Sequence, residues 1–351
     1  MISVFDHPWN GALFADPVCR EAWSAERQIA HFVSFESALS TALERAGRVE
    51  AGMGRAAAAA LAGFRPDLPK LRRAMATDGV PIPELVRQMR AACGPAAEAV
   101  HTGATSQDVL DTALVLTLQE VTDHVLARLD ELIASLGELI ERFGQNTLMG
   151  RTRMQAALPI TVASRLLPVE AALRGHATRL ASLRPQVERL QLGGAVGTNA
   201  ALGADAPEIA ASIASRLGLV PPSGHAWHTD RASLVDYANA LALISGTLGK
   251  FGQDIALMAQ QGIDEVRLAG GGGSSAMPHK SNPVKAELLI TLARFNAGHA
   301  GLMHQSMLHE QERSGAAWML EWMVLPQITC ATGCSLIAAN QICADIEGMG
   351  G

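Results

Sequence analysis

Residues 105–143 read TSQDVLDTALVLTLQEVTDHVLARLDELIASLGELIERF, and this stretch decides the fold. Its apolar residues recur at intervals of three and four, which is the period of a helix. They are Leu114, Leu118, Val121, Val125, Leu129, Leu132, Leu136, Ile140 and Phe143. Thr105 and Ser106 can cap the start with Asp108 in the first turn, and Gly144 can end the helix. At 1.5 Å per residue the helix is about 55 Å long, so we expect a rod shared between subunits.

The composition favours an all-α fold. The chain has 351 residues, of which 48% are hydrophobic, 18% charged and 4% aromatic, with a single Tyr. These proportions are typical of a globular chain with a large core. Strands prefer β-branched and aromatic residues, whereas helices prefer the Ala and Leu that recur along this sequence.

Three further long helices are predicted, over residues 159–183, 230–261 and 283–312. The first of them should bend near Pro168. The last should begin with Asn282 as its cap and Pro283 in its first position.

Proline and glycine interrupt the chain before residue 100, so the segments there are shorter. We therefore predict two domains. Residues 1–104 form a small N-terminal helical domain, with the first motif segment at its end. Residues 105–351 form a central domain of long, bundled helices.

Charge and leader sequence limit the possible partners. The net charge is −6 and there is no basic stripe with interleaved aromatics, so nucleic acid is not an expected partner. Neither a signal peptide nor a run of 18 apolar residues is evident, so no membrane association is expected. These features and the five sparse cysteines indicate a reduced, cytoplasmic compartment.

No metal or cofactor is expected. Cys330 and Cys334 are four residues apart, on one face of a predicted helix, and no further ligand is spaced to join them, so packing is the favoured interpretation. His225 and His228 likewise lack a third ligand at metal-binding spacing.

Three polar segments that contain glycine lie at the ends of the predicted rods. They are residues 101–108 (HTGATSQD), 150–161 (GRTRMQAALPIT) and 270–283 (GGGGSSAMPHKSNP). Taken alone, the first could be only a helix cap and the second only a solvated basic turn. The third is not a phosphate-binding P-loop, because His279 stands where that motif needs a glycine before Lys280. A loop with two serines and a lysine that ends at a helix N-terminus suits an anionic substrate.

Together the segments resemble the motifs of the fumarase/aspartase superfamily. Residues 274–283 match its signature GSSxMPxKxNP almost letter for letter, and the other two segments are similar to its substrate-binding motifs. Further stretches are similar to its 3-carboxy-cis,cis-muconate cycloisomerase branch. They are GGAVGTNAALG (193–203), WHTDR (227–231), LGKFGQD (248–254) and HEQERSGAAWMLEWMVLP (309–326).

This resemblance implies an assembly. Four subunits would form a homotetramer around a twenty-helix bundle, and each active site would take segments from three chains. Family members usually carry a further helical domain after the bundle, which we expect to be absent or reduced to a stub here.

The resemblance also implies roles for individual residues. Ser274 would exchange a proton with a substrate carbon, while Lys280 would act beside it. The expected substrate-binding residues are His101, Thr105, Ser106, Gln107, Thr152, Gln155, Ser275, Asn282 and Glu287. Glu287 matches the acid that pairs with the family's general-acid histidine.

That histidine is replaced here. The family pattern Thr-His-x-Gln reads Thr152-Arg153-Met154-Gln155, and an arginine does not exchange protons at neutral pH. Lactone formation needs no acid at this position, because the attacking group is a carboxylate with a pKa of about 4. We therefore expect Arg153 to act as a fixed cation in the lactonisation of 3-carboxy-cis,cis-muconate to 4-carboxymuconolactone, a step of the β-ketoadipate pathway.

Two alternatives stay open on the sequence. One is an adenylosuccinate- or argininosuccinate-type lyase of the same superfamily, and the other is a non-catalytic helical scaffold. The sequence also leaves open whether another anion, such as a sulfonate, can replace the carboxylate on carbon 3.

Overall fold

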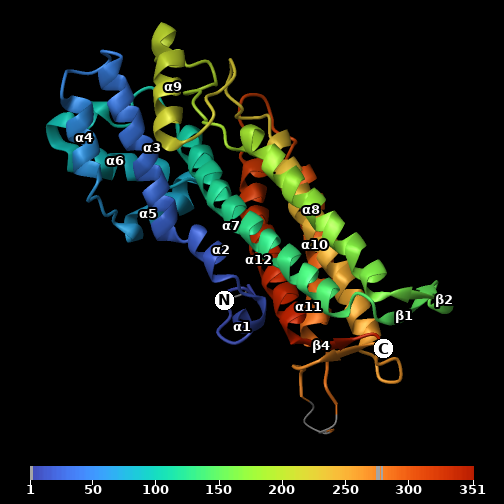
Figure 1. The fold of residues 1–351 in the computed structure, drawn as a ribbon. Helices are drawn as coiled ribbons and strands as arrows, with labels where there is room; N and C mark the ends of the chain where they lie inside the picture. Colours follow the sequence, from blue (N-terminus) through green and yellow to red (C-terminus); the bar gives the residue numbers. More distant parts are fainter. Residues whose placement is uncertain (1–2, 274–276, 278–279) are drawn as a thin grey trace.

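The computed structural model describes residues 3–273, 277 and 280–351. Helices dominate this part of the chain, which confirms the predicted all-α class (Figure 1). The α-helices are α1 (Gly11–Phe14), α2 (Pro17–Ala22), α3 (Ala25–Arg45), α4 (Met53–Leu61), α5 (Leu68–Asp78), α6 (Ile82–Cys93), α7 (Ser106–Phe143), α8 (Val162–Val187), α9 (Ala206–Leu217), α10 (Ala232–Met258), α11 (Val284–Gln305) and α12 (Ala316–Asp345). The strands are β1 (Thr147–Thr152), β2 (Gln155–Thr161), β3 (Val266–Leu268) and β4 (Ile346–Met349).

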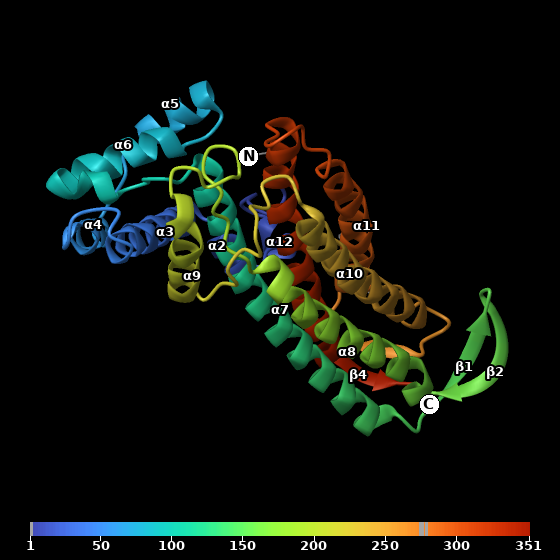
Figure 2. The same cartoon turned by 90° about the horizontal axis from the view of Figure 1, so that it is seen from above.

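Helices α7, α8, α10, α11 and α12 lie side by side as a long bundle (Figures 1 and 2). Their shared core is aliphatic, because the residues at helical spacing on the facing sides are mostly Leu, Ile, Val and Ala. α7 begins at Ser106, with Thr105 as its N-cap residue, and is followed by Gly144. The predicted rod of residues 105–143 is confirmed.

Helices α3, α4, α5 and α6 form a smaller group beside the start of α7, and α9 packs on α3 (Figure 1). The two short helices α1 and α2 precede α3 in the chain and lie outside this group, and α2 packs on α7 and α12. The N-terminal segment is therefore attached to the bundle. The domain boundary at residue 104 stays a prediction.

The helix predicted over residues 159–183 begins later than expected. Residues 159–161 belong to β2, which pairs antiparallel with β1, and α8 starts at Val162. The Thr161 side chain accepts a hydrogen bond from the Ser164 N–H, so the helix is capped at this point. Pro168 lies within α8, in its first two turns.

The helix predicted over residues 283–312 is shorter than expected at its C-terminus. Asn282 does not cap it: α11 begins at Val284 with Pro283 as its N-cap residue and no side-chain cap, and the backbone of Asn282 pairs with Gly272. α11 ends at Gln305, where the buried Ser306 hydroxyl donates to the Met303 carbonyl of the last turn. The chain then forms a loop before α12.

Among the described residues, α12 is long and apolar enough to cross a membrane by length and composition. However, 72% of its most apolar window is buried within the fold. A core helix of a large bundle has these same properties.

Candidate functional site

The first motif segment is fixed to the start of α7 by the buried carboxylate of Asp108. One oxygen accepts from the Thr105 N–H at 2.9 Å and the Gly194 N–H at 3.0 Å. The other accepts from the Gly193 N–H at 2.9 Å and lies 3.0 Å from His228 Nε2. Gly194 has φ +67°, which favours glycine. Asp108 therefore joins the segment to two stretches, 193–203 and 227–231, that are distant in sequence.

His101 is held in one orientation by Glu36. Its Nδ1 lies 2.6 Å from Glu36 Oε1, and its backbone N–H donates to Glu36 Oε2 at 2.9 Å. Glu36 is buried, whereas the His101 ring is half-buried, and its Nε2 has no hydrogen-bond partner among the described residues. The free nitrogen is thus available to a ligand, and the substrate contact stays a prediction.

Thr105, Ser106 and Gln107, which were also predicted to bind substrate, differ in their exposure to solvent. Thr105 and Ser106 are half-buried at the start of α7, but Gln107 is fully buried. The Gln107 amide donates to Asp111 Oδ2 at 3.0 Å and to the His228 carbonyl at 2.9 Å. Within one chain, the Gln107 amide therefore ties the first motif segment to Asp111 and to the His228 backbone.

Arg313 is a cation at this segment that the sequence motifs did not identify. It donates to Thr105 Oγ1 at 3.2 Å and to the Ala195 carbonyl at 3.0 Å. Its place within the stretch 309–326, which resembles the cycloisomerase branch, was the available signal.

A buried network of ion pairs lies next to the first motif segment, and the sequence motifs did not identify it either. Arg231 donates to Asp111 at 2.7 and 3.0 Å and to Glu321 at 2.8 and 2.5 Å, and all three side chains are fully buried. The Arg231 guanidinium also stacks 4.8 Å from the centre of the Trp227 ring. Burial alone would raise the pKa of Asp111, but the charge and hydrogen bonds of Arg231 outweigh it and hold this pKa below its ordinary value. The network fixes Asp111, which in turn holds Gln107.

The second motif segment forms the β1–β2 hairpin. Thr152 pairs with Gln155, and Arg153 and Met154 between them both have positive φ, of 50° and 66°. Two such residues in succession form the tight turn that suits the twist of a hairpin. Arg153 is therefore exposed at the tip, and it forms no ion pair within the described part of the chain.

The third motif segment has a closed stem. The Gly272 N–H donates to the Asn282 carbonyl at 2.9 Å, and the Asn282 N–H donates to the Gly272 carbonyl at 3.0 Å. A Cβ on Gly271 would lie 1.8 Å from Ser281 Oγ, so the two strands of the stem approach each other closely at this glycine. Lys280 is exposed, as is Glu287 in the first turn of α11. Ser274 and Ser275 lie outside the described residues.

The second and third segments share one end of the bundle. Arg151 of β1 pairs with Glu265 before β3 at 2.5 Å, and the Gly351 N–H after β4 donates to the Thr147 carbonyl at 3.2 Å. The first segment lies at the opposite end of α7, which over 38 residues spans about 57 Å. Figures 1 and 2 show this separation. A single chain therefore does not bring the three segments together.

Comparison with known proteins places this arrangement in a family. Residues 70–296 match the family described as Lyase. A 3-carboxy-cis,cis-muconate cycloisomerase of Pseudomonas putida is 38% identical over 343 residues, which cover 96% of this chain and 81% of that protein. The chain belongs to the fumarase/aspartase lyase family, whose members are typically oligomeric and act on small molecules.

Two solved structures share the fold. The crystal structure of 3-carboxy-cis,cis-muconate lactonizing enzyme from Pseudomonas putida has a TM-score of 0.91 at 38% identity and covers 97% of this chain and 77% of that chain. That of a fumarate lyase from Mesorhizobium sp. BNC1 has a TM-score of 0.90 at 32% identity and covers 96% of this chain and 76% of that chain.

Proposed function

We propose that this protein is a cycloisomerase that converts 3-carboxy-cis,cis-muconate to 4-carboxymuconolactone. The observation that carries this proposal is Arg153, which occupies the place of the family's general-acid histidine at the tip of the β1–β2 hairpin. The similarity to cycloisomerases over nearly the whole chain supports the same reaction. We infer a cytoplasmic enzyme of aromatic catabolism whose reaction needs no cofactor.

An arginine at this place favours lactonisation over the other reactions of the family. Elimination of hydroxide or an amine needs a proton on the leaving group, and loss of a general acid costs roughly 10²–10⁴ in rate. A carboxylate that attacks or leaves needs no proton, because its pKa is about 4. A permanent cation is then more useful, since the substrate carries three carboxylates.

In the proposed reaction, one substrate carboxylate adds across the conjugated double bond and closes a five-membered lactone. The electron pair of the double bond moves towards the neighbouring carboxylate, which becomes an aci-carboxylate. Ser274 then gives its proton to the adjacent carbon and recovers a proton from water. The tricarboxylate thus takes up one proton and becomes a lactone with two carboxylates.

The third segment supplies the charge that stabilises this intermediate. Lys280 is exposed next to the loop stem, and Asn282 precedes Pro283, the N-cap residue of α11. The free N–H groups of a helix start favour negative charge, as does the lysine. Lys280, Asn282 and the start of α11 would therefore lie around the aci-carboxylate.

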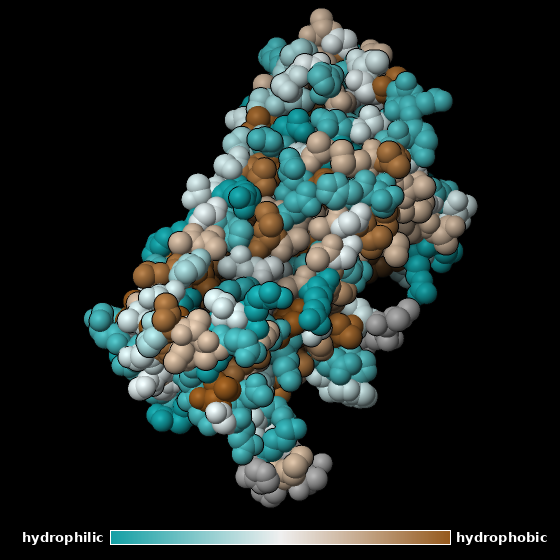
Figure 3. Space-filling model, turned by 90° about the vertical axis from the view of Figure 1, so that its right-hand side faces the viewer, coloured by the Kyte–Doolittle hydropathy of each residue, from teal (hydrophilic) through white to brown (hydrophobic). Residues whose placement is uncertain are grey.

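A homotetramer would complete the site. Segments at opposite ends of one chain can meet only if chains pack antiparallel, as in a shared bundle. Large apolar side chains remain exposed on the bundle helices and on the loop after α11: Leu167, Leu243, Leu302, Met307, Leu308, Met319 and Met323. Figure 3 shows hydrophobic residues between polar ones along one face.

We propose that Arg153 meets Glu287 of a neighbouring subunit.

Shared sites predict complementation between inactive variants. We expect Ser274→Ala and the double variant Thr105→Val/Ser106→Ala each to be impaired, while mixed tetramers regain activity because some sites receive only intact segments. Sedimentation should give a tetramer for both variants and for the parent. A stable, active monomer would refute the assembly, as would mixed tetramers that are no more active than their parents.

The charge of Arg153 predicts a separate kinetic effect. Arg153→His should mainly raise KM for 3-carboxymuconate, because a fixed charge felt equally by bound substrate and transition state is lost at neutral pH. kcat should change little. The matched control is Arg55→His, at an exposed arginine on the N-terminal helices, which should leave both constants unchanged. A large fall in kcat at unchanged KM would contradict the clamp role of Arg153.

A direct assay separates the proposed function from its rivals. Loss of muconate absorbance with formation of the lactone should be seen with 3-carboxymuconate. Turnover of adenylosuccinate or argininosuccinate in its place would favour the lyase alternative. No turnover of any of these substrates by the intact tetramer would favour a scaffold. A 3-sulfomuconate tested in parallel would show whether the anion on carbon 3 must be a carboxylate.

A further inference from the structure

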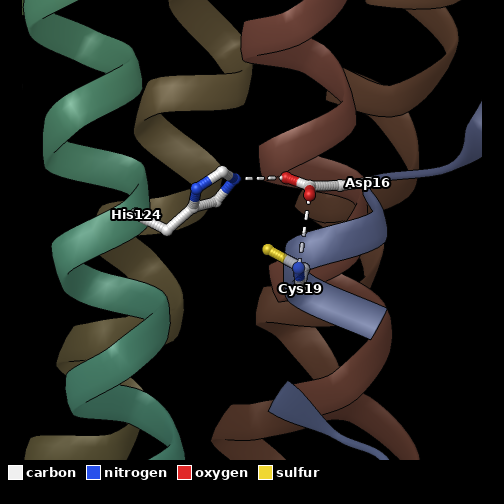
Figure 4. Close-up of side chains that lie close together, drawn as sticks. All are labelled: Asp16, Cys19 and His124. Carbon is white, nitrogen blue, oxygen red and sulfur yellow. Dashed lines mark hydrogen bonds and ion pairs between the residues drawn. The ribbon is translucent and has the colours of Figure 1, made fainter. Parts of the chain in front are cut away.

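Three possible metal ligands meet where the N-terminal segment crosses the bundle. Asp16 and Cys19 belong to the start of α2, and His124 lies in the middle of α7 (Figure 4). His124 Nε2 is 2.7 Å from Asp16 Oδ2, and the Cys19 sulfur extends towards the side of His124. The ligand atoms of the three side chains all lie within 4.8 Å of one another. Within the described ranges, this is the one such group of three or more His, Cys, Asp or Glu side chains.

The surroundings hold these groups in place. Asp16 and Cys19 are fully buried, and the His124 side chain is 11% exposed. The second oxygen of Asp16 accepts from the Val18 N–H at 2.9 Å and the Cys19 N–H at 3.2 Å, which fixes the carboxylate. Helix α12 lies directly against two of the three side chains: a Cβ on Gly333 of this helix would lie 2.0 Å from Asp16 Oδ2 and 3.0 Å from Cys19 Sγ. A glycine at this point of α12 leaves room for the cluster.

Cys19 and His124 also line a surface pocket of about 430 Å³ between α2 and α7. The pocket continues to Glu120, which pairs with Arg27 at its rim. An ion could therefore reach the cluster from solvent, and a water molecule could occupy a fourth position on the pocket side. An entry path and an open fourth position are both features of metal sites with three protein ligands.

The donor set selects the ion. A thiolate, an imidazole and a carboxylate are all ligands of Zn²⁺, whereas Ca²⁺ and Mg²⁺ prefer oxygen alone. Ligand atoms around tetrahedral zinc are roughly 3.3–3.6 Å apart, given Zn–S of about 2.3 Å and Zn–N of about 2.0 Å. The cluster reaches this geometry if separations of up to 4.8 Å shorten by about an ångström and the 2.7 Å contact of Asp16 with His124 opens by less.

We propose that Asp16, Cys19 and His124 bind one Zn²⁺ ion, which clamps the N-terminal segment to α7. The ion takes the place of the proton between Asp16 and His124, and the neutral ring of His124 then binds through Nε2 and carries its proton on Nδ1, by exchange with water. Cys19 loses its thiol proton to water, and Asp16 keeps its backbone hydrogen bonds through its other oxygen. The clamp joins α2 to the rod that carries the first motif segment at its start. This site is distinct from the proposed catalytic segments.

Metal titration of the full-length protein tests the proposal. After removal of metals with a chelator, calorimetry with Zn²⁺ should show one site per chain, and thermal unfolding should shift to higher temperature. Co²⁺ in place of Zn²⁺ should give a sulfur-to-cobalt charge-transfer absorption, which reports thiolate ligation. Cys19→Ala should remove this absorption and weaken Zn²⁺ binding by more than about 100-fold, since even outer-shell changes cost 10–100-fold.

Two further variants make the result decisive. Cys343→Ala removes another buried thiol, on α12, and should bind Zn²⁺ like the parent. His124→Gln keeps a hydrogen-bond donor for Asp16, so it should fold, as circular dichroism would show, yet lose the affinity. The proposal is overturned if the parent binds no stoichiometric Zn²⁺. It is equally overturned if Cys19→Ala and His124→Gln bind it as tightly as Cys343→Ala does.

Discussion

Replacing Ser274 by alanine should lower kcat by roughly 10²–10⁴-fold, the range of a lost proton-transfer group. The expectation rests on the match of residues 274–283 to the family signature. KM and the oligomeric state should be largely preserved, because the loss of a single hydroxyl usually changes stability little. Kinetic constants on 3-carboxymuconate and sedimentation would measure both effects.

Ser182→Ala is the matched control, since this exposed serine of α8 donates to the Arg179 carbonyl of its own helix and to no other described residue. It should behave like the parent. If Ser274→Ala retained a near-normal kcat, the serine would not deliver the proton, and the mechanism proposed above would be wrong.

Replacing Arg231 by methionine should cost about 3–5 kcal/mol of stability, the usual effect of breaking a buried ion pair. The change removes the cation but leaves Asp111 and Glu321 fully buried without it. Denaturant unfolding of the assembled protein at fixed protein concentration would show the loss as a lower midpoint. Activity should fall as well, because Asp111 holds Gln107 below the first motif segment.

Arg128→Met provides the comparison for Arg231→Met. Arg128 pairs with Glu131 on α7, where the Arg128 side chain is half-buried and the Glu131 side chain is exposed, and pairs that face solvent contribute about 0–1 kcal/mol. An equal, small shift for both variants would show that the buried network contributes nothing special to stability.

The motif segments could be recognised and the long rod predicted from sequence because their signals are local. α7 follows from apolar residues three and four apart, and the cap at Thr105 follows from its polar neighbours. The third segment was identified by a contiguous string of letters. The hairpin around Arg153 was missed because residues 159–161 extend the apolar pattern of α8, while most residues of the hairpin itself are exposed.

The sequence by itself determined the class of fold, the principal rod and the residues of the three motif segments. Only the tertiary structure decided that these segments lie at opposite ends of one chain, because their separation depends on the straight length of α7. Only the tertiary structure shows that Asp108 contacts Gly193 and His228. It also shows that Asp16 contacts His124, which lies 108 residues away in sequence. Such contacts arise when helices pack, and no periodicity within one segment records them.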